Sequence, residues 1–335
     1  MSQALSLWLT SAASGYADGA ALGQAMRELR AAELDRLPLP GAGQTLQRWQ
    51  ALASVGGHDL GLCKLFEGHT DALAIMAELG HPDTPPGSVW GTWASEPPQA
   101  RVTLRADGER LRLSGRKAWC SGAHVVSHGL LTAWDDQGRQ QLVAVAMAQP
   151  GVQVTDQGWQ AVGMAATRSV EVHFDDAVGE AIGAPGDYTG RPGFWQGGIG
   201  VAACWFGAAR QLADTLLAHC QARPEPHALA HLGAVDVALH GAACALRQAA
   251  EQIDRLPQAP CELLARRTRA LIEDCAERVI QHGGRALGAG PYCQNGRFAR
   301  LIADLPVFLR QSHAERDLAA LGQLLHTPQP RTWPL

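Results

Sequence analysis

The chain has 335 residues, of which 46% are hydrophobic and 18% charged, so it can bury a large core and is long enough for two or three domains. Its formal net charge is −4, and acidic and basic residues are mixed along the sequence, which gives no sign of a nucleic-acid or membrane surface. The N-terminus lacks a basic leader, and no segment reaches the roughly 18 uninterrupted apolar residues of a membrane span. We therefore expect a soluble, cytoplasmic protein. Its eight cysteines contain no CxxC pair, which favours reduced core thiols and no metal site.

The first part of the chain has the periodicity of helices. Between residues 21 and 79 apolar side chains recur every three or four positions, with one break at the PLPGAG stretch. The Pro- and Gly-rich stretch HPDTPPGS then ends the helical pattern. We assign residues 1–86 to an N-terminal helical domain.

The middle of the chain, residues 87–180, alternates with a period of two. Asp107-Gly108 is a strong hairpin signal between two short alternating runs, and residues 136–138 form a second turn signal of this kind. In SVEVHF the alternation sends Val170, Val172 and Phe174 to one face. This spacing predicts an antiparallel β-domain of about six to eight strands.

The helical period returns after a loop and lasts to about residue 325. Breaks occur at residues 222–226, 256–260 and 288–296. Four helices joined by short loops indicate an antiparallel four-helix bundle over residues 188–325, followed by a tail, residues 326–335. The fold class is α+β, with a helical domain, a middle antiparallel β-domain and a C-terminal four-helix bundle.

The stretch LSGRKAWCSGA, residues 113–123, places Trp119 and Ser121 at the end of a β-type run. A tryptophan here can fill the core of a sheet, or it can form the wall of a site for a flat ring. A flavin needs such a flat apolar surface together with a few directed hydrogen bonds. The residues alone leave both interpretations open.

The order of the three regions, together with this stretch, resembles the acyl-CoA dehydrogenase family of flavoproteins. In that family a K-x-W-I-[ST] pattern lays a tryptophan beside the flavin and points a hydroxyl at its N5 atom, which implies these roles for Trp119 and Ser121. WGTWASEP resembles the family strand that ends in [ST]-E-P, which implies a flavin contact for Ser95. VGMAATRSVEVHFDD resembles a further family segment, G-M-R-x-T-x-S, which supports the architecture more than the chemistry.

Two further segments resemble the parts of the family that bind the diphosphate of FAD. RALGAGPY resembles the Q-x-x-G-G-x-G loop, which implies that the backbone at Gly288 and Gly290 meets FAD; a plain glycine-rich helix connection is the alternative. The family's R-x-x-F-G segment falls at residues 222–227, where only Arg223 remains. The resemblance implies FAD as cofactor and, since the family's bundles pack on one another, a homodimer or homotetramer.

The expected catalytic base is absent from its usual position. A dehydrogenase of this family removes an α-proton with a glutamate, but the matching position is Ser312, followed by His313 and Glu315. Glu315 or His313 can be the acid or base, or the reaction is a different one. A histidine near this position resembles a feature of the flavin-dependent monooxygenases of the same fold.

Three functions stay open. The resemblance implies an FAD-dependent oxidoreductase that oxidises a CH–CH bond of a small-molecule or carrier-bound acyl substrate, with hydride transfer to the flavin. The absent glutamate and the PPQARV turn after Glu96, which differs from the family's Gly/Ser/Asp-rich turn, favour a monooxygenase or oxidase of the same fold. The third is a non-catalytic scaffold that has lost FAD.

Overall fold

The computed structural model describes residues 3–326 and Trp333, so most of the predicted tail lies outside the described residues. The chain divides into two compact units. Unit 1 consists of Met1–Leu39 and Asp59–Phe194, and unit 2 consists of Pro40–His58 and Trp195–Leu335. A helix that the sequence groups with the N-terminal region, within residues 40–58, therefore belongs to the same unit as the C-terminal helices.

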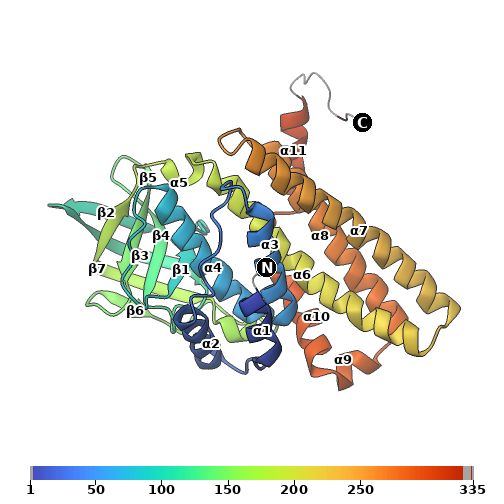
Figure 1. Ribbon diagram of the computed structural model, residues 1–335. Helices are drawn as coiled ribbons and strands as arrows, with labels where there is room; N and C mark the ends of the chain where they lie inside the picture. The colour runs from blue at the N-terminus through green and yellow to red at the C-terminus, as the bar shows by residue number, and fades with distance from the viewer. Residues whose placement is uncertain (1–2, 327–332, 334–335) are drawn as a thin grey trace. The chain divides into compact units, whose positions relative to one another are not determined.

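Unit 1 combines helices with a curled sheet (Figure 1). Its helices are α1 (Gln3–Ser11), α2 (Gly19–Ala31), α4 (Leu60–Glu78), the 3₁₀ turn η1 (Ala165–Thr167) and α5 (Asp187–Gly190). Its strands are β1 (Trp90–Trp93), β2 (Val102–Asp107), β3 (Arg110–Cys120), β4 (His128–Trp134), β5 (Gln140–Ala146), β6 (Val152–Val154) and β7 (Val170–Ile182). Aspartates begin two of the helices, because Asp18 accepts from the Ala21 N–H and Asp59 from the Leu62 N–H.

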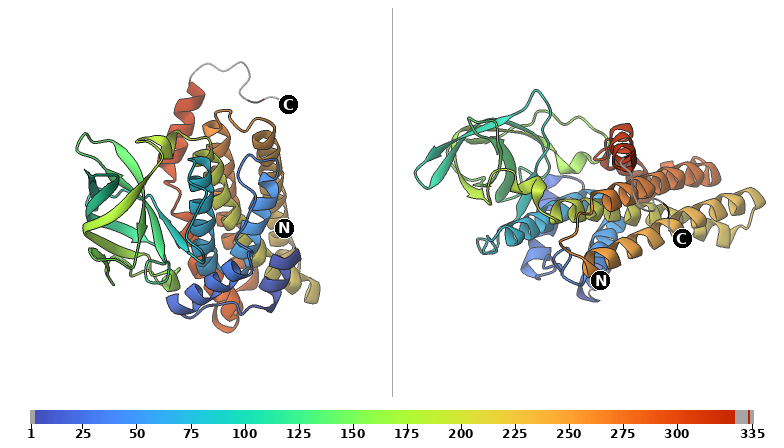
Figure 2. Two further views of the ribbon diagram at one scale, coloured as in Figure 1. Left: turned by 60° about the vertical axis from the view of Figure 1, so that its left-hand side comes forward. Right: turned by 90° about the horizontal axis from the view of Figure 1, so that it is seen from above.

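Five of the strands close into a small barrel, and the closed sheet is visible in Figure 2. Their order is β4, β2, β3, β7, β5 and back to β4. Strand β1 adds to β4, and β6 adds to β7. The prediction of a purely antiparallel domain is wrong for two pairs, since β1–β4 and β2–β4 are parallel. The physical reason lies in the connection after β1: Pro97 and Pro98 cannot donate ladder hydrogen bonds, so β2 does not fold back on β1.

The local predictions for the sheet are confirmed. β2 and β3 form a hairpin in which Asp107 pairs with Arg110, and Gly108 has the positive φ of 63° that such a tight turn needs. The predicted turn at residues 136–138 joins β4 to β5. The three alternating side chains of β7 predicted to share a face, Val170, Val172 and Phe174, are all buried.

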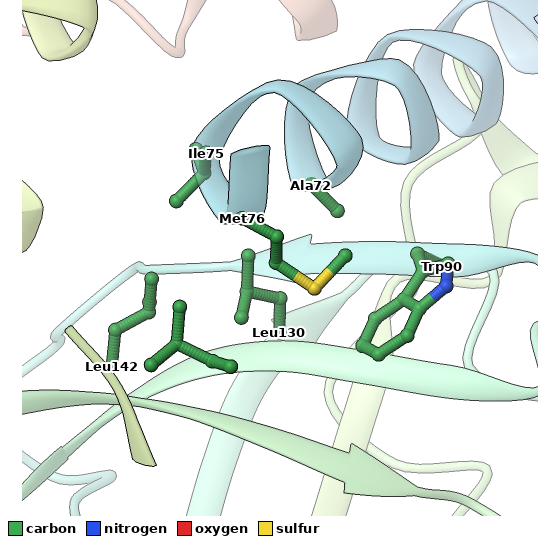
Figure 3. Close-up of a cluster of buried hydrophobic side chains, with 7 residues drawn as sticks. Ala72, Ile75, Met76, Trp90, Leu130 and Leu142 are labelled. Carbon is green, nitrogen blue, oxygen red and sulfur yellow. The ribbon is translucent and has the colours of Figure 1, made fainter. Parts of the chain in front are cut away.

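Helix α4 covers part of the sheet through an apolar stripe (Figure 3). Ala72, Ile75 and Met76 recur at helical spacing and face the sheet. The side chains they meet are Trp90 of β1, Leu130 of β4, Leu142 of β5 and Ile182 of β7. This core holds α4 directly over β1.

Unit 2 contains seven helices among the described residues (Figure 1). They are α3 (Thr45–His58), α6 (Gly193–Ala222), α7 (Pro226–Arg255), α8 (Glu262–Leu287), α9 (Gly290–Gln294), α10 (Gly296–Leu309) and α11 (Glu315–His326). The predicted fourth helix of the bundle is broken into α10 and α11. Ala314, with a φ of 44°, lies in the turn between them and cannot continue a right-handed helix.

The outward face of α7 is unusually apolar. By length and composition alone α7 could cross a membrane, and 22% of its most apolar stretch is buried. Its exposed side chains include Leu229 and Val237, but also the charged Asp236 and Arg247.

Helices α3 and α6 approach each other at glycine positions. A Cβ built on Gly207 would lie 1.8 Å from the Ala53 carbonyl oxygen, and one built on Gly56 would lie 2.5 Å from the Cys204 carbonyl oxygen. Both obstacles are backbone atoms, which cannot rotate away as a side chain can. The two helices therefore keep this spacing only with glycine at these positions.

We expect Gly207→Ala to lower the free energy of unfolding by about 3 kcal/mol, because the added methyl group forces two packed helices apart. Gly233→Ala is the matched control, since a Cβ there meets no atom within 4 Å, and alanine should raise stability by up to about 1 kcal/mol. Urea unfolding followed by circular dichroism measures both. Equal effects of the two substitutions would show that the helix spacing is not constrained at Gly207.

Candidate active site

Trp119 lies in a β-bulge that turns its side chain out of the sheet. Across β3 and β7, Lys117 is paired with Val172 and Cys120 with Val170, so two residues of β3 face one residue of β7. Trp119 itself has a φ of 58° and is 50% exposed, although Cys120 is fully buried. A left-handed conformation at a bulky residue costs on the order of 1–3 kcal/mol and tends to occur at functional sites. Of the two interpretations of Trp119, the structure excludes the sheet-core one.

Ser121 begins a chain of hydroxyl groups. Its Oγ lies 2.8 Å from the Oγ of Ser169, which lies 3.0 Å from the Oγ1 of Thr167. Thr167 in turn donates to the carbonyl oxygen of Met164 over 2.7 Å. The Gly122 N–H also donates to the Thr167 carbonyl oxygen, at 2.9 Å. The segment that the sequence marks only as a sign of architecture thus contacts a predicted site residue directly.

Ser121 also lines a recess between α4 and β1. The recess is small, with room for about one water molecule. Its walls are Lys64, Leu65, Gly68, Trp90, Gly91, Thr92, Trp93, Ser121 and Val126. The indole Nε1 of Trp93 donates to the Ser121 carbonyl oxygen at 3.1 Å. The Trp93 ring lies against the backbone at Gly91 and Gly129, where any Cβ would clash with it. The Trp93 ring and Gly91 together shape this wall of the recess.

A buried lysine is bonded at the same end of the barrel. The Nζ of Lys117 donates to the Glu96 Oε1 at 2.7 Å, and to the carbonyl oxygen and Oγ1 of Thr132 at 2.9 and 2.7 Å. The other carboxylate oxygen of Glu96 accepts from the Trp134 Nε1 at 3.1 Å. All three donors of the ammonium group are therefore satisfied. Burial lowers the pKa of Lys117, against the opposing effect of the Glu96 carboxylate.

This ion pair brings the predicted flavin-contact residues of unit 1 together. Ser95 directly precedes Glu96, while Trp119 and Ser121 follow Lys117 by two and four residues. Because these two charged groups are in contact, and the Trp93 indole donates to the Ser121 carbonyl oxygen, the segments that carry Ser95, Trp119 and Ser121 lie next to each other. Sequence reasoning identified both motifs but missed the pairing, which joins residues 21 positions apart.

Buried hydrogen bonds fix α4 against β1 and so define the recess. The backbone N–H of Trp90 donates to the His69 Nδ1 at 3.1 Å, and the His69 Nε2 lies 2.9 Å from the Asp35 Oδ2. Since Nδ1 accepts, the proton of the neutral ring is on Nε2 and points at Asp35. The Thr92 hydroxyl donates to the Gly68 carbonyl oxygen at 2.7 Å. Sequence reasoning gave no signal for this dyad.

The predicted acid–base residues lie in unit 2, in the turn that starts α11. The backbone N–H of His313 donates to the Asp317 Oδ2 at 2.9 Å, and the Ala314 N–H donates to the Ser312 Oγ at 3.0 Å. Ser312 is buried, whereas His313 and Glu315 are exposed. Ser312 and Asp317 thus bond to backbone N–H groups at the start of the helix. An acid or base role for Ser312, His313 or Glu315 stays a prediction.

The predicted diphosphate-binding residues also belong to unit 2. Gly288, with a φ of 63°, ends α8, and Gly290 begins α9. A Cβ at either glycine would meet no protein atom within 4 Å, so the backbone there is open on that side. Arg223 is exposed just beyond the end of α6. Their role toward a cofactor stays a prediction.

Several solved structures share this fold at low sequence identity. KijD3, in complex with FMN and dTDP-3-amino-2,3,6-trideoxy-4-keto-3-methyl-D-glucose, is 21% identical, with a TM-score of 0.76 over 91% of this chain and 87% of its own. FMN-bound TdsC from Paenibacillus sp. A11-2, a dibenzothiophene monooxygenase, is 18% identical, with a TM-score of 0.78 over 98% and 96% of the two chains. Methanesulfinate monooxygenase MsuC from Pseudomonas fluorescens is 16% identical, with a TM-score of 0.74 over 98% and 96%.

These likenesses show that the chain has the acyl-CoA dehydrogenase-like fold. No family model matches the chain, and no curated protein matches it by sequence. What the neighbours bind and catalyse is therefore evidence for a proposal rather than a property of this protein.

Lys117→Met is expected to lower the free energy of unfolding by about 3 kcal/mol, because it leaves the Glu96 carboxylate without its cation. Adding Glu96→Gln should recover part of this loss, since the unpaired charge is then removed as well, so the two substitutions are non-additive in urea unfolding. Arg105→Met breaks the exposed ion pair of Arg105 with Asp176 and should leave stability nearly unchanged. Additive effects of Lys117→Met and Glu96→Gln would contradict the coupling.

Proposed function

We propose that the protein is a flavin-dependent monooxygenase that uses FMN to oxidise a small molecule. The observation that carries the flavin part is Trp119, an aromatic ring held in a left-handed conformation and exposed beside the Ser121 hydroxyl. The FMN-bound KijD3 and TdsC, and the monooxygenases TdsC and MsuC, support the cofactor and the reaction class. FMN replaces the predicted FAD in this proposal, because the segment around Arg223 keeps only one residue of the family's diphosphate motif.

The residues of unit 1 fit a flavin. A flat, partly apolar ring with polar edges needs a face to lie against and hydrogen-bonding groups at its rim. Trp119 offers the face, and Ser121 and Ser95 offer hydroxyl groups on adjacent segments.

When bound in its reduced form, the flavin supplies the electron pair that a monooxygenase needs to split molecular oxygen, with one atom entering the substrate and the other leaving as water. The chain's own residues orient the flavin ring and shield it from solvent. The Trp119 ring binds one face, and the Lys117–Glu96 pair holds Trp119 and Ser95 in place. The exposed start of α11 offers no buried carboxylate of the kind that α-proton removal from a thioester requires, because Glu315 is exposed.

The first test measures the binding of FMN to the purified protein. FMN is titrated into the protein, and the change in protein fluorescence gives the Kd. We expect Trp119→Ala to raise the Kd for FMN about tenfold, which corresponds to the loss of one aromatic stacking contact. Trp333→Ala, which removes an equally large and even more exposed ring, is the control and should leave the Kd unchanged. Equal effects of the two substitutions on the Kd would show that Trp119 is not part of the FMN site.

The reaction class is decided by what consumes the bound flavin's electrons. Oxygen uptake with reduced FMN and a candidate substrate, together with incorporation of one ¹⁸O atom into the product, supports the monooxygenase. Anaerobic bleaching of the flavin by an acyl-CoA thioester would establish a dehydrogenase instead. A protein that binds neither FMN nor FAD would be a scaffold.

We also propose that the chain forms a homodimer or homotetramer through α7. The apolar outward face of this helix supports the proposal, because Leu229 and Val237 are 44% and 67% exposed. The exposed charges of Asp236 and Arg247 on the same helix favour a second copy of the chain over a lipid environment as its cover.

Light scattering coupled to size exclusion should give a mass of at least twice the 35.6 kDa of one chain. Val237→Glu is expected to lower this mass, since it places a charge in the apolar contact. Val162→Glu, at an even more exposed valine of unit 1, is the matched control and should leave the mass unchanged. A monomeric unmodified protein would contradict the proposal.

A further inference from the structure

We propose that Thr167 and Ser169 orient the Ser121 hydroxyl so that it accepts, and does not donate, a hydrogen bond at the ligand, which makes the site select reduced over oxidised flavin. This inference rests on the proposed function, because it concerns how the same site distinguishes two states of its cofactor. Thr167 and Ser169 are positioning residues, since they act through Ser121.

The direction of the hydroxyl chain follows from its last member. The carbonyl oxygen of Met164 can only accept, so the hydrogen bond of 2.7 Å to it uses the single hydroxyl proton of Thr167. The Oγ1 of Thr167 is then an acceptor toward Ser169, 3.0 Å away, which must donate its own proton there. Ser169 in turn can only accept from Ser121, at 2.8 Å. The single proton of Ser121 thus points away from the ligand.

Burial prevents water from reversing this order. The exposed fractions of Thr167 and Ser169 are 1% and 5%. Water therefore cannot replace the protein partner of either hydroxyl, and breaking one of these bonds would leave a buried polar group without a hydrogen bond. The backbone also holds Thr167 firmly. Met164 and Arg168, on either side of it, have φ values of 59° and 41°, and the Gly122 N–H donates to its carbonyl oxygen. Such strained backbone persists only where the surroundings determine it.

The chemistry of the ligand then decides which state binds better. As part of the proposed function, Ser121 contacts the flavin N5 atom, as the resemblance implies. That atom carries a hydrogen in the reduced ring and a lone pair in the oxidised ring. A Ser121 oxygen that presents only lone pairs bonds to the reduced ring and faces the lone pair of the oxidised one. One neutral hydrogen bond of this kind corresponds to about a fivefold preference for the reduced form.

The experiment compares the Kd for oxidised FMN with the Kd for anaerobically reduced FMN in three proteins. In the unmodified chain we expect reduced FMN to bind about fivefold more tightly. Thr167→Val keeps the shape of the side chain but removes its hydroxyl, so Ser169 can donate to Ser121 and Ser121 can donate to the ligand. The preference should then disappear or reverse. Thr167→Ser keeps the hydroxyl and should keep the preference.

The outcomes separate the two proposals. The inference would be overturned if the ratio of the two Kd values were the same in all three proteins. It would also be overturned if Thr167→Val lost affinity for both redox states by the same factor. Either result would assign these hydroxyls a merely structural role and leave flavin binding intact. Absence of binding by either form of FMN would overturn the proposed function and the inference together. Ser169→Ala serves as the second variant if Thr167→Val does not fold, because it also releases the Ser121 proton toward the ligand.

Discussion

A buried ammonium group organises the end of the β-barrel that carries the candidate site. Removing Lys117 from water carries a large desolvation cost, which is offset only because Glu96 and Thr132 satisfy all three of its donors. The constraint is geometric as well as energetic. Since Ser95 adjoins Glu96 and Trp119 lies two residues beyond Lys117, any rearrangement that separates these segments leaves two charges without partners.

Around this rigid pair the backbone is strained. Trp119, Met164 and Arg168 all have positive φ values, and each lies within a few bonds of Ser121 or of the hydroxyls that contact it. Left-handed conformations at non-glycine residues are individually costly, so their grouping in one place indicates a site whose geometry outweighs local preference. The bulge exposes an aromatic face, and the loop that contains Thr167 sets the direction of a hydroxyl.

The fold and the chemistry of the protein follow from different parts of the chain. Structures with 16–21% identity share the fold of this chain, which shows that the fold persists where most residues differ. The position at which the family carries a glutamate is here Ser312, whose hydroxyl accepts the Ala314 N–H at the start of α11. Because Ser312 bonds to the backbone of the turn before α11, the candidate site residues of unit 1 are the better guide to the proposed function.

The sequence by itself determined the local features, because their causes are local. The hairpin at Asp107-Gly108 and the buried alternation of β7 need only neighbouring residues. The role of Trp119 as the wall of a flavin site stays a prediction, although the structure shows that its side chain is half exposed. Only the tertiary structure decided the parallel pairings of β1 and β2 with β4, the Lys117–Glu96 pair and the contact of Ser121 with Ser169. The contact of Ser121 with Ser169 joins residues 48 positions apart. The direction of its hydrogen bond depends on the carbonyl group of Met164, which accepts from Thr167. Periodicity carries no information about such contacts, since they arise from how the barrel closes.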